Sequence, residues 1–175
     1  MDRVMREKIN QIAQAVRESF DIQVPVLDME HVVSELGGTI ERDFMLTEFA
    51  DGKIEKLKDS DLAFRISISP LQPETRQRFS IAHEIGHLFI HMGYMIDDDL
   101  WNSPGTYYRK QSGEVEYHAN EFAAAFLMPK EEYRQKLFEN QIGENKFNLG
   151  TVAEYFGVSL EAAVNRGRWL GFLSW

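Results

Sequence analysis

The segment FSIAHEIGHLFIH, residues 79–91, combines an H-E-x-x-H motif with a run of apolar residues. Positions i and i+4 lie on one face of an α-helix, so the imidazoles of His83 and His87 can bind the same zinc ion. Glu84 follows the first histidine directly, where its carboxylate can act as a general base. The segment therefore predicts a buried helix that carries a metal site and a base beside it.

The polar groups of this motif need a partner, because the residues around them are apolar. Two imidazoles and a carboxylate cost free energy in such surroundings unless another group compensates their polarity. Histidines that are satisfied by ordinary core contacts are the alternative interpretation. Three scarce residue types at a fixed spacing favour a bound metal over that alternative.

A third ligand must come from elsewhere, since a catalytic zinc ion normally takes three protein ligands and leaves one position for water. His91 follows His83 by eight residues. That spacing is about 12 Å along a helix, too far for both residues to bind one ion. We therefore interpret His91 as a solvent-side or rim histidine.

A second predicted helix, residues 114–127, offers candidate ligands on two edges of its apolar stripe. Glu116 lies on one edge, and Glu114 and His118 lie on the other. The helical pattern alone does not choose between the edges. Asn120, one turn after Glu116, favours Glu116, because it supplies a hydrogen-bonding residue beside the ligand on the same face. Solvated surface acids are the alternative.

Composition excludes several other classes of protein and site. The chain has 175 residues, 43% of them hydrophobic, and a mean hydropathy of −0.37 without a long apolar run, so we expect no membrane segment. The absence of cysteine excludes disulfides, Cys-ligated zinc, iron–sulfur clusters and thiol catalysis. No secretory signal is visible, which predicts a cytoplasmic protein. A formal net charge of −9 would repel a phosphate backbone, so we expect no direct nucleic acid binding.

The periodic segments predict an α+β fold, mostly helical, in which a small three-stranded sheet packs against a zincin-type active-site helix. We expect a single metallopeptidase domain over residues 1–175. Residues 1–60 would form the N-terminal helices and the start of the sheet. Residues 73–127 would form the zinc-site helices and a rim loop, and residues 130–175 a C-terminal helical segment.

Local signals place the individual elements. Asp28 can cap a short helix, and an Asp51-Gly52 turn is expected between the first two strands. Residues 92–112 lack periodicity and are interpreted as a long loop beside the site. The expected strands are 39–46, 53–58 and 62–69. The expected helices are 4–20, 28–36, 73–91, 114–127, one that starts after Pro129, 149–156 and 160–170.

The C-terminal segment has the apolar rhythm of a helix-turn-helix, with a turn at residues 157–159. Residues 148–175 carry no net charge, and Gly167 falls within the helix that would read DNA. A helical support or a docking surface is therefore the better interpretation. The aromatic residues from Trp169 to Trp175 indicate that the tail docks on this core or on a partner.

Three segments together resemble the ImmA/IrrE family of zinc metallopeptidases. They are FSIAHEIGHLFIH, EYHANEFAAAFLMP from residue 116 and VAEYFGVSLEAAVNR from residue 152, and the likeness spans about residues 64–173. The resemblance implies that His83, His87 and Glu116 hold the zinc ion. It also implies that Glu84 is the catalytic glutamate.

By this resemblance the chain would be an intracellular zinc-dependent endopeptidase of gluzincin-like type, with Zn2+ as its cofactor. Its protein substrate would be a helix-turn-helix repressor, cleaved to relieve repression of a mobile element or of stress genes. The chain looks like a stand-alone protease domain. A non-catalytic, zinc-stabilised anti-repressor that binds its target without cleaving it is the alternative, and a DNA-binding regulator is a more distant one.

A second group that stabilises the oxyanion is usual in peptide hydrolysis. The candidates are Tyr94, Tyr107, Tyr108 and His118. Ordinary packing or loop surface is the more usual role for each of these side chains, so we keep only His118 as a further catalytic candidate. We also expect the long loop and the aromatic tail to contribute to docking of the substrate.

Overall fold

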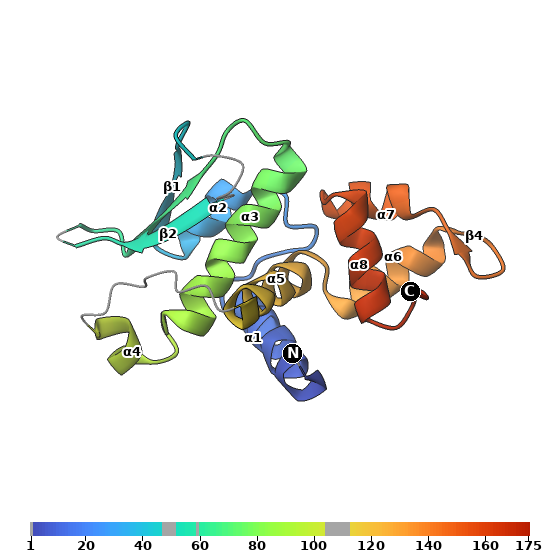
Figure 1. Ribbon diagram of the computed structural model, residues 1–175, viewed down its shortest axis with the longest axis horizontal. Coiled ribbons are helices and arrows are strands. Elements are labelled where there is room, and N and C mark those ends of the chain that lie inside the picture. Colours follow the sequence, from blue (N-terminus) through green and yellow to red (C-terminus); the bar gives the residue numbers. More distant parts are fainter. Residues whose placement is uncertain (1, 47–51, 59, 104–112) are drawn as a thin grey trace.

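The computed structural model describes residues 2–46, 52–58, 60–103 and 113–175. In chain order, its elements are α1 (Arg3–Ser19), α2 (Met29–Glu35), β1 (Gly38–Arg42), β2 (Gly52–Lys56), β3 (Phe64–Ile68), α3 (Glu74–Gly86), the π-helix η1 (His87–His91), α4 (Asp98–Asn102), α5 (Gly113–Leu127), α6 (Lys130–Glu139), β4 (Gln141–Gly143), β5 (Lys146–Phe147), α7 (Leu149–Phe156) and α8 (Leu160–Trp169). The predicted α+β class is confirmed, with a small sheet packed against α2 and α3 (Figure 1). Within the described residues, no helix is both long and apolar enough to span a membrane.

Strand β3 lies at the centre of the three-stranded sheet, with β1 parallel to it on one side and β2 antiparallel on the other. Ile66 of β3 pairs with Ile40 in β1 and with Ile54 in β2. The side chains of Phe64, Ile66 and Ile68 are almost completely buried. β3 takes the central position because a strand with this much buried apolar surface needs neighbours on both sides.

The first two strands of the chain, between which a turn is expected, are not neighbours in the sheet. β1 and β2 occupy opposite edges, separated by β3. Gly52 begins β2, and Asp51 lies outside the described residues. A turn signal reports only local backbone preference, whereas the burial of β3 decides which strands pair.

Helices α1 and α2 form as the sequence pattern predicts. The apolar stripe of α1 places Ile9, Ala13 and Val16 in the core, where this helix packs along α5. Asp28 caps α2 by accepting a hydrogen bond from the backbone N–H of His31 at 2.9 Å. Both features depend on neighbours within one or two turns, which is why the sequence reveals them.

The helix predicted over residues 73–91 consists of two parts. α3 ends at Gly86, and the next turn is η1, in which the backbone N–H of Met92 donates to the carbonyl of His87 at 3.0 Å. Such π turns are rare and often occur at functional sites. Here the π turn contains the second histidine of the motif and His91.

The segment predicted as a loop, residues 92–112, contains the short helix α4, which the sequence pattern does not predict. Asp97 caps this helix by accepting a hydrogen bond from the backbone N–H of Leu100 at 2.9 Å. A helix of five residues is too short to show an apolar period. The rest of the segment, residues 104–112, lies outside the described part of the chain.

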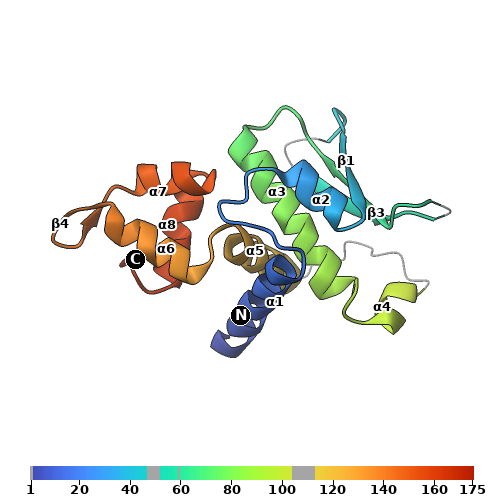
Figure 2. The ribbon, with the colours of Figure 1, turned by 180° about the vertical axis from the view of Figure 1, so that it is seen from behind.

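The helices α6, α7 and α8 form a group on the opposite side of α5 from the sheet (Figures 1 and 2). We refer to this group, residues 130–175, as the C-terminal unit. A small β4–β5 pair, which the sequence pattern does not predict, lies at its outer end. Part of the tail packs against α6 within this unit, since the ring of Phe172 stacks on that of Tyr133 with centroids 6.5 Å apart. Trp175 remains 72% exposed.

A buried arginine anchors the C-terminal unit to the rest of the protein. The guanidinium of Arg166 in α8 lies 3.0 Å from the carboxylate of Glu121 in α5 and 2.8 Å from Oδ1 of Asn10 in α1. Burial lowers the pKa of Arg166 to about 10, an effect that Glu121 partly offsets, so the group stays charged at neutral pH. Removing one partner of a buried ion pair is costly, so this contact holds α8 in place beside α5.

Candidate metal centre

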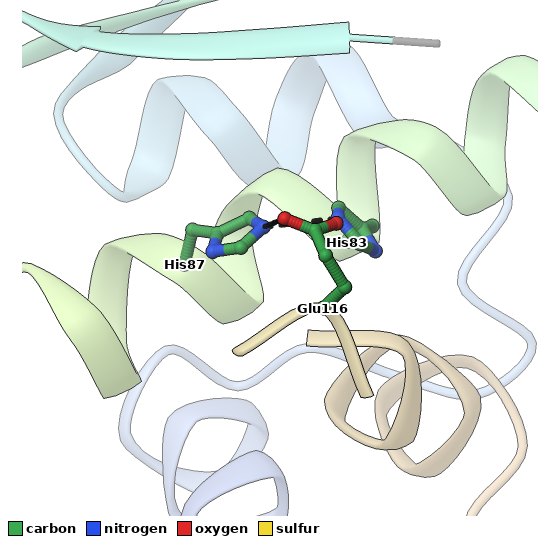
Figure 3. A group of neighbouring side chains, drawn as sticks. All are labelled: His83, His87 and Glu116. Carbon is green, nitrogen blue, oxygen red and sulfur yellow. Dashed lines mark hydrogen bonds and ion pairs between the residues drawn. The ribbon is translucent and has the colours of Figure 1, made fainter. Parts of the chain in front are cut away.

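Three side chains from neighbouring segments point toward one another in Figure 3. His83 lies in α3, His87 begins η1, and Glu116 lies in the first turn of α5. Nε2 of His83 lies 3.0 Å from Nε2 of His87 and 3.2 Å from one carboxylate oxygen of Glu116. Nε2 of His87 lies 3.6 Å from the other oxygen. We refer to these three residues as the donor cluster.

The donor cluster fits a metal ion with nitrogen and oxygen ligands. Its ligand atoms all lie within 4.8 Å of one another. Two nitrogens bound to one tetrahedral zinc ion at about 2.0–2.1 Å lie about 3.3 Å apart, close to the separation of the two Nε2 atoms here. The three residues could therefore hold one ion with little movement of α3 and α5.

The far side of each imidazole is also in contact with a polar group. Nδ1 of His83 lies 2.9 Å from Oδ1 of Asn120, one turn after Glu116 on α5. Nδ1 of His87 lies 2.9 Å from Nδ1 of His91. A histidine that binds a metal through Nε2 carries its proton on Nδ1, and that proton needs an acceptor. Asn120 and His91 each lie where such an acceptor would be.

His91 does not belong to the donor cluster, but it contacts the site more closely than a solvent-side residue would. His91 is half-buried, and besides its contact with His87 its ring stacks on that of His118 with centroids 5.9 Å apart. Burial, with smaller contributions from His118 and His83, lowers the pKa of His91 to about 4, so its ring is neutral at neutral pH. The sequence signal that could have revealed the contact is the i+4 spacing from His87, which places both rings on one helix face.

Glu84 is buried, at 5% exposure, and lies next to the donor cluster without being part of it. Its carboxylate packs against Gly52 at the start of β2, where a Cβ atom would stand 3.1 Å from Oε1 of Glu84. Figure 3 shows β2 passing over the side chains of the donor cluster. A glycine at this position leaves room for the carboxylate between α3 and β2.

The sequence matches a known family over most of its length. The family model Peptidase_M78, described as the IrrE N-terminal-like domain, matches residues 42–167, which include Glu84 and the whole donor cluster. The chain belongs to this family. A comparison with curated proteins gives no match.

A solved structure shares the fold of this IrrE N-terminal-like domain. It is described as a Mycobacterium tuberculosis transcriptional regulator, and it matches with a TM-score of 0.59 at 18% sequence identity. The match covers 91% of the present chain and 46% of that chain, so the present chain spans less than half the length of that protein. At this identity the likeness concerns the fold alone.

The candidate ligands on the two edges of α5 lie in different surroundings. Glu116 faces the two histidines of α3 and η1, whereas Glu114 is exposed at the start of the helix. His118 lies outside the donor cluster and packs against His91. Its Nε2 atom is buried without a hydrogen-bond partner among the described residues.

The tyrosines considered as oxyanion donors divide into two groups. The hydroxyl of Tyr94 donates to the carbonyl of Leu36 at 2.8 Å, and its ring is buried in the core. This side chain therefore serves packing, as the alternative interpretation proposes. Tyr107 and Tyr108 lie outside the described residues.

Gly86 of the motif allows α5 to approach α3 closely. A Cβ atom at this position would stand 3.1 Å from both Cα and the carbonyl oxygen of Ala119, and equally close to Cβ of Phe122. Backbone atoms cannot move aside as a flexible side chain can, so a side chain at position 86 would push the helices apart. The close contact thus sets the distance over which Glu116 reaches the two histidines.

We expect Gly86→Ala to lower the free energy of unfolding by about 1–3 kcal/mol, the usual cost of overpacking, and to weaken metal binding. The matched control is Gly150→Ala in α7, where a Cβ atom would stand 3.4 Å from Oδ1 of Asn148, an ordinary contact. This control should leave stability unchanged or slightly raised. Urea unfolding and metal titration measure both effects, and equal stability of the two variants would contradict the prediction.

Proposed function

We propose that the protein is a cytoplasmic zinc-dependent endopeptidase that cleaves a helix-turn-helix repressor and so relieves repression of a mobile element or of stress genes. The observation that carries this proposal is the donor cluster with Glu84 buried next to it. Membership in the IrrE N-terminal-like domain family supports the peptidase activity. The repressor substrate rests on the resemblance of the three motif-bearing segments to peptidases that act on such proteins.

Each residue of the site has a separate task in this proposal. His83, His87 and Glu116 are the metal ligands, and a set of nitrogen and carboxylate ligands suits zinc. When bound, zinc lowers the pKa of water and polarises the scissile carbonyl group. Glu84 accepts the proton from the attacking water and later gives it to the leaving amine. The chain thus supplies the ligands and the acid–base group of the reaction.

The position of the donor cluster limits the form of the substrate. The side chains of His87 and Glu116 are 4% and 33% exposed, so a compact folded surface cannot bring a peptide bond to them. A folded protein would have to open locally, which costs free energy. The scissile bond therefore lies in a loop or a locally unfolded segment of the substrate. Rapid cleavage of unrelated folded proteins would contradict this part of the proposal.

The direct test incubates the purified, zinc-loaded protein with each helix-turn-helix protein encoded beside its gene and records intact masses. Cleavage of one of these proteins that stops with a chelator and returns with added zinc supports the proposal. Cleavage that persists after complete removal of the metal contradicts it. Tight binding of one candidate without any cleavage would favour the anti-repressor instead.

We expect that replacing Asn120 or His91, the residues that contact the Nδ1 atoms of the two ligand histidines, weakens metal binding by about 10–100-fold, the usual effect of removing such a contact. The variants are Asn120→Ala and His91→Leu, and each removes an acceptor 2.9 Å from the Nδ1 atom of a ligand histidine. Titration of the metal-free protein with zinc in competition with a chelating dye measures the change.

A further variant separates orientation of His87 from simple packing. His91→Gln keeps an oxygen that can accept a hydrogen bond, so it should recover part of the affinity that His91→Leu loses. His31→Ala, on the exposed face of α2, is the control and should bind zinc as the unmodified protein does. Equal affinities of the Leu and Gln variants would show that His91 does not orient His87.

A further inference from the structure

A groove of about 530 Å³ lies between helices α3 and α5 on one side and the C-terminal unit on the other. Its volume is within the range of about 300–1,000 Å³ that is usual for ligand pockets. Figure 1 shows α8 as the helix of the C-terminal unit that faces α3 and α5. These three helices form the walls, and their uncharged side chains in the groove include Phe79, Tyr117, Ala124, Ala162 and Trp169.

The groove adjoins the donor cluster through Asn120, although none of the three cluster residues lines it. Asn120 lines it and also lies 2.9 Å from Nδ1 of His83. Phe79 precedes His83 by one helical turn, and Tyr117 follows Glu116 directly in the sequence. A polypeptide that reaches the donor cluster would therefore bring a neighbouring side chain to the mouth of the groove.

The charges of the groove are largely compensated by one another. Arg166 and Glu121 lie 3.0 Å apart at its base, and Arg6 lies 3.4 Å from the same carboxylate. Arg76 and Glu161, which carry opposite charges, also line the groove. An uncharged side chain can therefore enter without an unpaired charge being buried, which would be costly.

Two large aromatic side chains of the groove are open to solvent. Tyr117 is 65% exposed and Trp169 is 49% exposed. The guanidinium of Arg6 lies 4.0 Å from the centre of the Trp169 ring and holds one face of it in place. Exposed aromatic side chains beside a pocket whose charges are largely paired are typical anchors for apolar groups of a partner.

We propose that this groove is a specificity site, which binds one large uncharged side chain, aromatic or aliphatic, of the substrate polypeptide next to the scissile bond. The inference rests on the proposed peptidase function and assigns the C-terminal unit to substrate selection. The buried Arg166 anchor supports it, because a groove can select by size only if α8 keeps a fixed distance from α5.

The test measures binding apart from cleavage. Zinc-loaded Glu84→Gln protein is titrated into fluorescein-labelled decapeptide pools, random except for a central Phe, Leu, Glu or Lys, and anisotropy is recorded. We expect the Phe and Leu pools to bind about 10-fold or more tightly than the charged pools, a usual discrimination for an apolar pocket. Equal affinity for the four pools, or preference for a charged pool, would overturn the assignment.

Variants of the groove connect this preference to its walls. Ala162→Phe, added to the Glu84→Gln protein, fills the groove from α8 and should remove the preference. Thr151→Phe places the same side chain on the exposed surface of α7 and should keep it. If Ala162→Phe does not fold, Tyr117→Ala decides the question, because its side chain is 65% exposed and its loss leaves the core intact. An unchanged preference in Tyr117→Ala and Ala162→Phe would overturn the proposal.

The same pools, incubated with the active zinc-loaded protein and read by mass spectrometry, separate this inference from the proposed function. Cleavage without an aromatic or aliphatic residue enriched beside the cut would overturn the groove assignment and leave the peptidase proposal standing. A binding preference that Ala162→Phe removes, in a protein that cleaves neither peptides nor repressors, would support the groove and contradict the peptidase proposal.

Discussion

Glu84→Gln is expected to retain the fold and the metal while peptide cleavage falls by about 100- to 10,000-fold, the usual contribution of a general base. The amide has nearly the same shape as the carboxylate, so it fits the buried space beside Gly52. It cannot accept the proton of the attacking water. The donor cluster does not include Glu84, so metal binding should stay within error of the unmodified protein.

Three measurements together check this expectation: thermal unfolding, metal content and the rate of cleavage of a cognate repressor. Glu35→Gln, at an exposed position of α2, is the matched control and should cleave normally. Undiminished cleavage by Glu84→Gln would refute its role as the base. A non-catalytic anti-repressor would not need this carboxylate, so relief of repression in cells carrying Glu84→Gln would favour that alternative.

Glu116→Ala should weaken zinc binding by more than about 100-fold. This exceeds the 10–100-fold typical of losing a residue that only contacts a ligand. The carboxylate of Glu116 lies 3.2 Å from Nε2 of His83 and 3.6 Å from Nε2 of His87, so its loss removes one of three convergent donors. The remaining two histidines would hold zinc with an incomplete set of protein ligands. Cleavage at limiting zinc should fall in parallel.

The control for this change lies two residues away on the same helix. Glu114→Ala removes an exposed acid of equal charge, so any effect of net charge alone would appear in both variants. Zinc titration of the two variants should therefore give widely different affinities. If Glu114→Ala or His118→Ala proves the more damaging change, the ligand lies on the other edge of α5.

Most of the fold could be predicted from local patterns, and the errors concern non-local contacts. The stripe with Ile9 and Val16 predicts α1, and Asp28 predicts the start of α2, because each signal and its effect lie within two turns. The pairing of β1 with β3 joins strands that are far apart in the sequence. No local signal contains that pairing, so the turn expected between the first two strands does not reveal the strand order.

The candidate site shows the same division. His83, Glu84 and His87 follow from one motif, since their spacing on a helix determines their relative positions. The choice of Glu116 depends on which side of α5 faces α3, and the helical pattern leaves that open. In the structure, Glu116 lies on the side of α5 that faces the two histidines. Its role as a ligand remains a prediction.

By itself, the sequence determined the α+β class, the motif-bearing helix and the residue types available for a metal, because these depend on composition and on spacing within one helix. Only the tertiary structure decided the sheet order, the contact of His91 with His87 and His118, and the groove between α5 and α8. The reason is physical: these features are distances between side chains on separate elements. Such distances depend on how closely helices and strands pack, as Gly86 against Ala119 illustrates.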